Sequence, residues 1–333
     1  MIRIWLNHWF STAYNIIQLI RGGVPGAYII GSNEHAESPI QAVCDEWYAE
    51  PVLKGEDYVN FCLEFCAAHR VDVFMPRREM QAVSKAMDRF AAVGVKVMAE
   101  AYPLVSLFAD KDRAYRAMRE AGVANVPDYR MVETPAQFRE AYEELSRAHG
   151  QICFKFVRDE GGKSYRLIDN RPRGYASLFK RQTTRISFDE AYAALSERER
   201  FSPVMVMPYL PDEEISVDCL ATGRGLIAVP RVKDATRVEH VRYDEEILAA
   251  CARICAQWPL SQPCNIQFKL SKGVAYLLEI NTRMSGGVQM ACAVSGVNIP
   301  AIAVRKLLGE DAPWTLNRVE RGVTHVEVPV VLG

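Results

Sequence analysis

Polar side chains recur at every second position in two β-rich runs between residues 264 and 287. Side chains two positions apart in a β-strand point to the same face of the sheet. The positions are Asn265, Gln267, Glu279, Asn281 and Arg283. If the two faces coincide, three or four oxygen donors lie together beside one guanidinium. A few hard oxygen ligands suit a magnesium ion whose other positions are filled by nucleotide phosphates. The alternative is a strand face that only meets water.

A short polar turn joins the two runs and predicts a hairpin. Ser271-Lys272-Gly273 supplies the glycine that such turns favour. In the second run, Leu278 and Ile280 alternate with the polar residues, so we expect both to enter the core.

The whole string resembles the metal-binding hairpin of ATP-grasp enzymes. It reads Asn-x-Gln-Phe, a turn, and then Glu-Ile-Asn-x-Arg-x-Ser-Gly-Gly. It is most similar to the version in carbamoyl-phosphate synthetase large subunits and biotin carboxylases. The resemblance implies that Gln267, Glu279 and Asn281 hold Mg²⁺ (or Mn²⁺). It also implies that Arg283 contacts an acyl phosphate.

Residues 1 to about 105 alternate predicted strands and helices, which indicates a parallel, Rossmann-like sheet. The expected strands are Arg3–Leu6, Ala27–Ile30, Val71–Met75 and Val95–Met98, and the expected helices are Thr12–Arg21, Asp57–His69 and Gln81–Val93. No glycine-rich turn follows the first strand, which argues against a NAD-dependent oxidoreductase. Pro76–Glu79 follows the third strand at its carboxyl end, where open α/β sheets tend to bind ligands. A solvated helix start is an equal alternative there.

Two lysines stand out in the next part of the chain. Lys111 begins a helix that Asp110 caps and Gly122 ends. Lys155 lies in an apolar strand, where its charge needs a partner such as a phosphate. The resemblance implies that Lys111 reaches the ATP phosphates, although an isolated lysine of this kind is usually an exposed surface residue.

A glycine loop follows the strand that carries Lys155. Gly161, Gly162 and Lys163 lie between two strands, and Val157 stands where a P-loop needs glycine. The order of strand, glycine loop and strand is that of ATP-grasp enzymes. Glycines let backbone N–H groups close over phosphates, so we expect these three residues to bind ATP.

An apolar strand, a short linker and an acidic residue follow in residues 204–218. By resemblance this linker is the adenine hinge. The carbonyl matching Met207 and the N–H matching Leu210 then pair with the adenine edge, and Glu214 binds the ribose hydroxyls. The next strand carries Arg231 and Lys233 on one face, which look toward the reaction centre if the strand lies beside the hairpin.

The remaining segments are less specific. Residues 170–200 are rich in Arg and Lys and form either a solvated surface or a basic lid. The other expected elements are helices at Pro135–His149, Asp189–Ser196, Tyr243–Gln257, Gly287–Val294 and Ile299–Leu308, strands at Arg166–Ile168 and Leu226–Lys233, and a β-like tail at Val323–Val331.

Composition excludes several classes of protein. The 333 residues carry a net charge of −1, so no basic footprint for nucleic acid stands out. No apolar run is long enough to span a membrane, and the N-terminus lacks the features of a signal peptide. The nine cysteines are scattered and never spaced CxxC, which favours a reduced, cytoplasmic protein.

Together these features predict an α/β and α+β protein, in which an N-terminal Rossmann-like parallel sheet precedes a two-lobed ATP-grasp fold. The expected domains are residues 1–105, 106–200 and 201–333. The resemblance implies a ligase that uses ATP and Mg²⁺ to join a small-molecule carboxylate to an amine or thiol, releasing ADP. The alternatives are a carboxylate kinase and a nucleotide-binding regulatory module without turnover. The oligomeric state is open, with a homodimer as one alternative.

Overall fold

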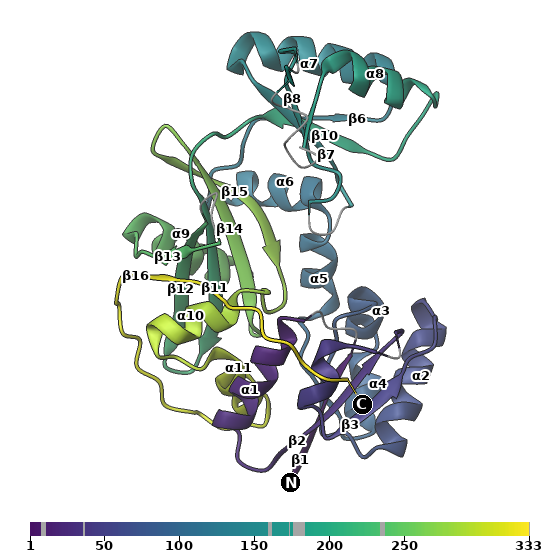
Figure 1. The fold of residues 1–333 in the computed structure, drawn as a ribbon, viewed down its shortest axis with the longest axis vertical. Coiled ribbons are helices and arrows are strands. Elements are labelled where there is room, and N and C mark those ends of the chain that lie inside the picture. Colours follow the sequence, from purple (N-terminus) through teal and green to yellow (C-terminus); the bar gives the residue numbers. More distant parts are fainter. Residues whose placement is uncertain are drawn as a thin grey trace. The chain divides into compact units, whose positions relative to one another are not determined.

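The computed structural model describes residues 1–7, 11–35, 37–158, 162–172, 174–175, 184–233 and 237–332. The chain forms two compact units, whose elements are labelled in Figure 1. The first unit comprises Met1–Phe108, Glu213–Phe268 and Leu278–Gly333, and the second comprises Ala109–Asp212 and Lys269–Leu277. The first unit therefore combines the first expected domain with most of the third. The division into three domains stays a prediction.

Sheet A, a five-stranded parallel sheet, occupies the N-terminal part of the first unit. Its strand order is β3-β2-β1-β4-β5. The elements are β1 (Ile2–Asn7), α1 (Ala13–Gly23), β2 (Ala27–Asn33), η1 (Pro39–Val43), β3 (Glu46–Ala49), α2 (Gly55–Ala68), β4 (Val73–Met75), α3 (Met80–Lys85), α4 (Met87–Ala92), β5 (Lys96–Val97) and α5 (Tyr102–Phe108). The predicted parallel sheet is confirmed. Because β1 lies between β2 and β4, the strand order reverses at the carboxyl ends of β1 and β4, where such sheets bind ligands.

One helix prediction in this part of the chain is wrong. The expected helix Gln81–Val93 is two short helices, α3 and α4, which meet at Ala86 with φ −100° and ψ 12°. Ala86 is buried in the same apolar cluster as Val83 and Phe90. Tertiary packing has here overridden a sequence with good helix propensity.

The second unit contains sheet B, with strand order β6-β10-β7-β8-β9. Its elements are α6 (Lys111–Ala121), β6 (Arg130–Val132), α7 (Pro135–His149), β7 (Ile152–Phe156), β8 (Arg166–Ile168), β9 (Arg185–Ile186), α8 (Phe188–Ser196) and β10 (Val204–Pro208). The Asp110 side chain accepts hydrogen bonds from two backbone N–H groups at the start of α6, and Gly122 ends the helix at φ 64°. Both predicted helix signals are thus confirmed.

Sheet C has the strand order β15-β14-β11-β12-β13-β16. Its strands are β11 (Glu214–Thr222), β12 (Gly225–Lys233), β13 (Glu239–Val241), β14 (Cys264–Ser271), β15 (Val274–Asn281) and β16 (Arg321–Val323), and α9 (Glu245–Gln257), α10 (Val288–Ser295) and α11 (Ile299–Leu307) complete the fold. The β-like tail expected at Val323–Val331 is wrong. The strand ends at Val323, where it pairs with β13, and the described residues after it have no regular structure.

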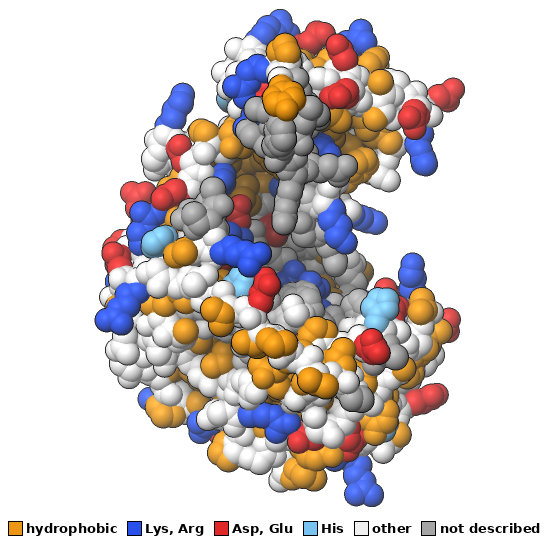
Figure 2. Space-filling model, in the orientation of Figure 1, with side chains coloured by type: hydrophobic (Ala, Val, Ile, Leu, Met, Phe, Trp, Pro, Cys, Tyr) orange, Lys and Arg blue, Asp and Glu red, His pale blue; other side chains and the backbone are white. Residues whose placement is uncertain are grey.

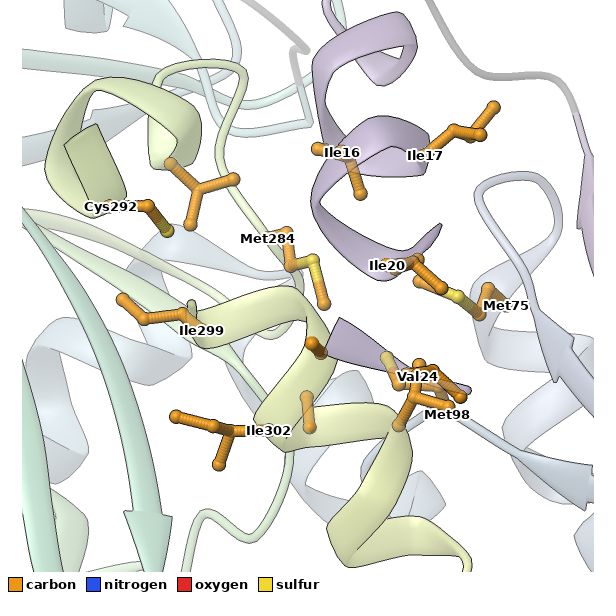
Figure 3. Close-up of a cluster of buried hydrophobic side chains, with 14 of the residues drawn as sticks. Ile16, Ile17, Ile20, Val24, Met75, Met98, Met284, Cys292, Ile299 and Ile302 are labelled. Atoms are coloured by element: carbon orange, nitrogen blue, oxygen red, sulfur yellow. The ribbon is translucent and has the colours of Figure 1, made fainter. Parts of the chain in front are cut away.

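An apolar core joins sheet A to α10 and α11, the two helices that follow β15. Figure 3 shows Ile16 and Ile20 of α1 in one buried cluster with Met284 and with residues of α11. Met75 of β4 and Met98 after β5 belong to the same buried cluster. Met284 is 3% exposed, so this core anchors the chain directly beside Arg283.

Charged side chains of both signs are interspersed on the face drawn in Figure 2. Among the described residues, no single helix is long and apolar enough to cross a membrane. The bent pair α10 and α11, at 103°, meets that test only when the two are taken together. Many of their side chains, including Val288, Ala291 and Ile302, lie in the core just described.

Candidate active site

The predicted hairpin is present and its turn has the expected geometry. β14 and β15 are neighbours in sheet C and are joined at Lys272-Gly273. Both residues have positive φ, 51° and 76°, as a type I′ turn requires. Glycine reaches this conformation without strain, which explains its place in the motif.

The polar residues of the hairpin are held in two pairs, one on each strand. On β14, the Gln267 Nε2 donates to Asn265 Oδ1 at 3.0 Å. On β15, the Asn281 Nδ2 donates to Glu279 Oε1 at 2.9 Å. In both amides the nitrogen is therefore engaged within the strand, and the oxygen is the atom that remains to act as a ligand. The convergence of the two pairs on one cation stays a prediction.

The alternation along β15 is less regular than expected. Ile280 is buried as predicted, but Leu278 is only half-buried, and Leu277 is fully buried instead. Two buried residues three positions apart depart from the strict period of two. The prediction that Leu278 enters the core is therefore wrong.

Arg283 lies in the turn after β15, next to the buried Met284. Its Nη1 donates to the Met284 carbonyl at 3.1 Å, and its side chain is half-buried. It lines a small pocket together with Met75, Pro76, Met98, Pro263 and Met284. Met75 ends β4 and Met98 follows β5. The pocket therefore lies at the carboxyl edge of sheet A, where a ligand site after the third strand was one of two equal alternatives from the sequence.

Arg231 is not exposed to a ligand, because its guanidinium is enclosed by the protein. The residue is 1% exposed. Its Nε donates to Asp218 Oδ2 at 2.8 Å, and its Nη1 pairs with Glu239. Burial opposes the charge of Arg231, but these two carboxylates outweigh it and raise its pKa. We expected Arg231 to look toward the reaction centre if its strand lay beside the hairpin, but β11 lies between β12 and the hairpin, and Arg231 is buried.

The same guanidinium reaches the turn that follows Arg283. Arg231 Nη2 donates to Ser285 Oγ at 3.0 Å, and that hydroxyl also accepts from the Gly287 N–H at 3.1 Å. A Cβ at Gly287 would lie 2.3 Å from Arg231 Nη1, so only glycine lets the guanidinium approach this closely. Arg231 thus fastens the Ser285–Gly287 segment to sheet C.

Lys233 and Glu214 face each other on neighbouring strands. They are cross-strand partners, and the Lys233 Nζ lies 2.6 Å from Glu214 Oε1. Each side chain is about one third exposed. Glu214, which the sequence assigns to ribose, is therefore paired with a lysine in this structure.

Asp218 and Glu239, the two carboxylates on Arg231, were not among the residues predicted from the sequence. A signal existed for Asp218, because Glu214, Ser216 and Asp218 alternate along β11 as the hairpin residues do along β15. Glu239 had no such signal, since β13 has three residues and is recognised only by its pairing with β12.

Lys155 and the glycine loop belong to the second unit. Lys155 lies on β7, half-buried, with its Nζ 5.8 Å from the centre of the Tyr115 ring. Gly162 has φ 67°, and its carbonyl accepts from Tyr165 N–H in a tight turn. Lys163 is exposed and Lys111 is half-buried at the start of α6. Gly161 lies outside the described residues.

The hinge strand β10 pairs with β7 on one side and β6 on the other. Tyr209 N–H donates to the Gln151 carbonyl at 2.8 Å, and Met207 lies opposite Cys153. Because alternate residues of a strand address the same neighbour, the backbone groups of Met207 also face β7. Pro208 is at the intervening position of the strand, beyond the end of the pairing with β6 at Val206, and its carbonyl is 3.7 Å from Cys153 Sγ. Leu210 follows the end of β10.

Within the described residues, no group of three or more His, Cys, Asp or Glu side chains is arranged to hold a metal ion. The predicted ligands on the hairpin are one carboxylate and two amides, which is a different donor set. The predicted residues divide between the units. Glu214, Arg231, Gln267, Glu279, Asn281 and Arg283 are in the first unit, and Lys111, Lys155, Gly162, Lys163, Met207 and Leu210 are in the second.

Sequence comparison supports the resemblance seen in the hairpin. Residues 200–329 match the family model described as ATP-grasp in the biosynthetic pathway with Ter operon. The chain is 22% identical over 339 residues to the carbamoyl phosphate synthase arginine-specific large chain of Geobacillus stearothermophilus. That match covers 97% of this chain but only 30% of the relative, so the chain spans less than a third of that protein's length.

Structural comparison gives the same fold over nearly the whole chain. An ADP complex of N5-carboxyaminoimidazole ribonucleotide synthetase matches with a TM-score of 0.68 at 15% identity, covering 91% of this chain and 76% of the other. The biotin carboxylase domain of 2-oxoglutarate carboxylase from Hydrogenobacter thermophilus, a dimer with MgADP and bicarbonate, also gives 0.68, at 16% identity over 95% and 72%. The predicted fold class and the resemblance to such units are confirmed.

Proposed function

We propose that this chain, which has the fold of ATP-grasp proteins, is an ATP-dependent ligase that joins a carboxylate to an amine or thiol. ATP phosphorylates the carboxylate, the acyl phosphate is attacked by the nucleophile, and ADP and phosphate leave. The observation that carries the proposal is the run Glu279, Asn281 and Arg283, which follows one strand into a turn anchored in the core. We place the reaction in the cytoplasm, with small molecules as substrates.

In this proposal most of the residues that bind the nucleotide belong to the second unit. Lys111, Lys155, the loop at 161–163 and the hinge take the roles that the sequence assigns to them, with one change. The Pro208 carbonyl, rather than that of Met207, accepts from the adenine amino group, because Met207 faces β7. The Leu210 N–H keeps its role as donor. Glu214 exchanges part of its contact with Lys233 for the ribose hydroxyls.

The donor set of the hairpin fits magnesium. Glu279 supplies a carboxylate, and the amide oxygens of Gln267 and Asn281 are the free ends of engaged side chains. A bound Mg²⁺ or Mn²⁺ supplies charge that offsets the negative charge of the transferring phosphoryl group. The residues themselves contribute position and a fixed polar environment.

Arg283 is the group we assign to the reacting carboxylate. Its guanidinium stays charged and can hold carboxylate and phosphate oxygens through two parallel hydrogen bonds. The pocket beside it is lined mainly by methionine and proline side chains. Low polarity around a single cation strengthens its attraction for a developing negative charge.

Loss of the Lys155 charge should weaken nucleotide binding. Lys155→Met keeps the volume and removes one charge-assisted hydrogen bond to phosphate, worth roughly 1.5–3 kcal/mol. Calorimetric titration with ATP measures the change. Lys54→Met, at an exposed position, is the control and should leave the affinity unaltered. Equal affinities for both variants would exclude Lys155 from the phosphate site.

The cation should bind together with the nucleotide. Of the three predicted ligands only Glu279 carries a formal charge, so the protein alone should hold Mg²⁺ poorly and bind it when ATP phosphates complete the site. Glu279→Gln should then lower Mn²⁺ affinity in the presence of nucleotide, measured by electron paramagnetic resonance. Tight binding without nucleotide that Glu279→Gln leaves intact would contradict this site.

The proposed reaction is tested by trapping its intermediate. The protein is incubated with ATP, magnesium, hydroxylamine and a panel of amino acids and small carboxylic acids. We expect a hydroxamate and stoichiometric ADP with the correct acid. AMP and pyrophosphate would indicate adenylation instead. In a parallel incubation without hydroxylamine, amine or thiol, ADP and acyl phosphate formed together over many turnovers would favour the carboxylate kinase. Nucleotide binding without any turnover would favour the regulatory module.

A further inference from the structure

We infer that Arg231, Asp218 and Asn265 form a positioning relay that decides which end of the Gln267 amide faces a divalent cation. The relay is a chain of three buried side chains behind the hairpin. The inference rests on the proposed function, because it assumes that a cation binds with the nucleotide at Gln267, Glu279 and Asn281. It assigns a role to residues that do not themselves touch the cation.

The relay begins at Arg231, whose guanidinium has only donors. Its Nε donates to Asp218 Oδ2 at 2.8 Å, and both side chains are 2% exposed. This pair fixes the orientation of the carboxylate. The second oxygen, Asp218 Oδ1, is then turned toward Asn265 and accepts from its Nδ2 at 3.0 Å.

Asn265, on the neighbouring strand β14, is the next member of the hydrogen-bonded chain. Its Nδ2 also donates to the Val217 carbonyl at 3.2 Å. A carboxylate and a carbonyl both act only as acceptors, so the nitrogen of this amide must lie on their side. The Ser216 hydroxyl contacts both ends of the amide, at 3.0 and 3.2 Å, and fits either orientation. Two acceptors thus fix a fully buried amide.

The oxygen of Asn265 in turn fixes Gln267. Asn265 Oδ1 accepts from Gln267 Nε2 at 3.0 Å, which directs Gln267 Oε1 away from Asn265. A reversed Gln267 would set two oxygens against each other and present an NH₂ group to the cation. Arg231 therefore orients Asp218, Asp218 orients the Asn265 amide, and Asn265 orients the Gln267 amide so that its oxygen faces the proposed cation site.

Asp218→Asn should reverse this polarity without changing the shape of the side chain. Arg231 still requires an acceptor, so the new amide turns its oxygen to Arg231 and its NH₂ to Asn265. Asn265 then loses one of the two acceptors that fixed its amide and keeps only the Val217 carbonyl, and when it reverses toward the new NH₂ group Gln267 presents nitrogen to the cation. We expect Mn²⁺ affinity, measured by electron paramagnetic resonance with the β,γ-imido analogue of ATP, to fall roughly 10- to 100-fold.

Glu239→Gln is the matched control, since it removes the other carboxylate from the same guanidinium. It leaves the bonds from Asp218 to Gln267 in place, so Mn²⁺ affinity should change by less than about threefold. Equal losses in the two variants would show that the network acts only through stability and would overturn the relay.

A second substitution separates positioning from a general structural effect. Glutamate at position 267 presents an oxygen in either orientation, so Gln267→Glu should restore Mn²⁺ binding when added to Asp218→Asn. In the parent protein the same change sets a carboxylate against Asn265 Oδ1, and Mn²⁺ should bind no more tightly despite the added charge. The relay requires this non-additivity, and equal effects of Gln267→Glu in both backgrounds would overturn it.

Two further outcomes are decisive. If Asp218→Asn does not fold, the single variant Gln267→Glu still tests the relay, because tighter Mn²⁺ binding than in the parent would overturn it. If the parent protein with nucleotide binds no Mn²⁺, the proposed function fails and the role of the relay fails with it. Binding by the parent with no loss in Asp218→Asn rejects the relay alone.

Discussion

Replacing Arg283 with alanine should lower turnover on the order of 10³-fold, the scale of losing one preorganised electrostatic group at a reacting centre. Arg283 lies in the turn after β15 with Met284 buried beside it, so its position is fixed before any substrate arrives. A preoriented guanidinium gains its full effect because it need not reorganise as charge develops. Nucleotide affinity should change far less, since the lysines that we propose to bind the phosphates are untouched.

The measurement is the rate of ADP release with the acid identified by hydroxamate trapping, together with ATP affinity by calorimetry. Arg283→Lys should recover only part of the rate, because an ammonium lacks the planar fork for two parallel hydrogen bonds. Arg224→Ala, an exposed arginine paired with Asp311, is the surface control. A rate loss in Arg283→Ala that follows from weaker ATP binding would refute the assignment.

Replacing Arg231 with methionine should lower the free energy of unfolding by roughly 3–5 kcal/mol, because it leaves carboxylates buried without their counter-charge. Asp218 is 2% exposed and Glu239 is 18% exposed, and both pair with this one guanidinium. Restoring neutrality should recover stability. The triple variant with Asp218→Asn and Glu239→Gln should therefore be more stable than Arg231→Met alone.

Arg130 provides a matched comparison within the same chain. It also pairs with two carboxylates, Asp128 and Glu144, but its side chain is 39% exposed. Arg130→Met should lower stability by less than about 1 kcal/mol, the usual range for exposed ion pairs. Urea unfolding measures all four proteins. Similar losses for the two single variants would mean that Arg231 is not held as a buried ion pair in solution.

The elements that carry the site were predictable where local chemistry determines them. The turn was predictable from Gly273, because glycine reaches a positive φ without strain. Helix α6 was predictable from the cap at Asp110 and the stop at Gly122. The sequence expected helix Pro135–His149 with the bounds that α7 has. These signals depend on a few neighbouring residues, so no knowledge of the rest of the fold is needed.

The features that depend on distant partners were not predictable. Alternation along the strand correctly placed Arg231 and Lys233 on one face. It did not predict that Arg231 is enclosed by Asp218 and Glu239 while Lys233 is partly exposed, because this depends on residues of other strands. Likewise, β9 has two residues, and pairing with β8 is what makes it a strand. Such features come from tertiary contacts between residues far apart in the sequence.

The core that α1 shares with α10 and α11 also has a consequence for synthesis. The residues of sheet A and α1 are synthesised before those of α10 and α11. The apolar side of α1, with Ile16, Ile17 and Ile20, packs in part against residues from Met284 onward. Well over two hundred residues must therefore be translated before that surface is covered. During that interval the apolar side of α1 lacks part of its packing partners, so we expect chaperones that recognise apolar segments to bind the nascent chain there.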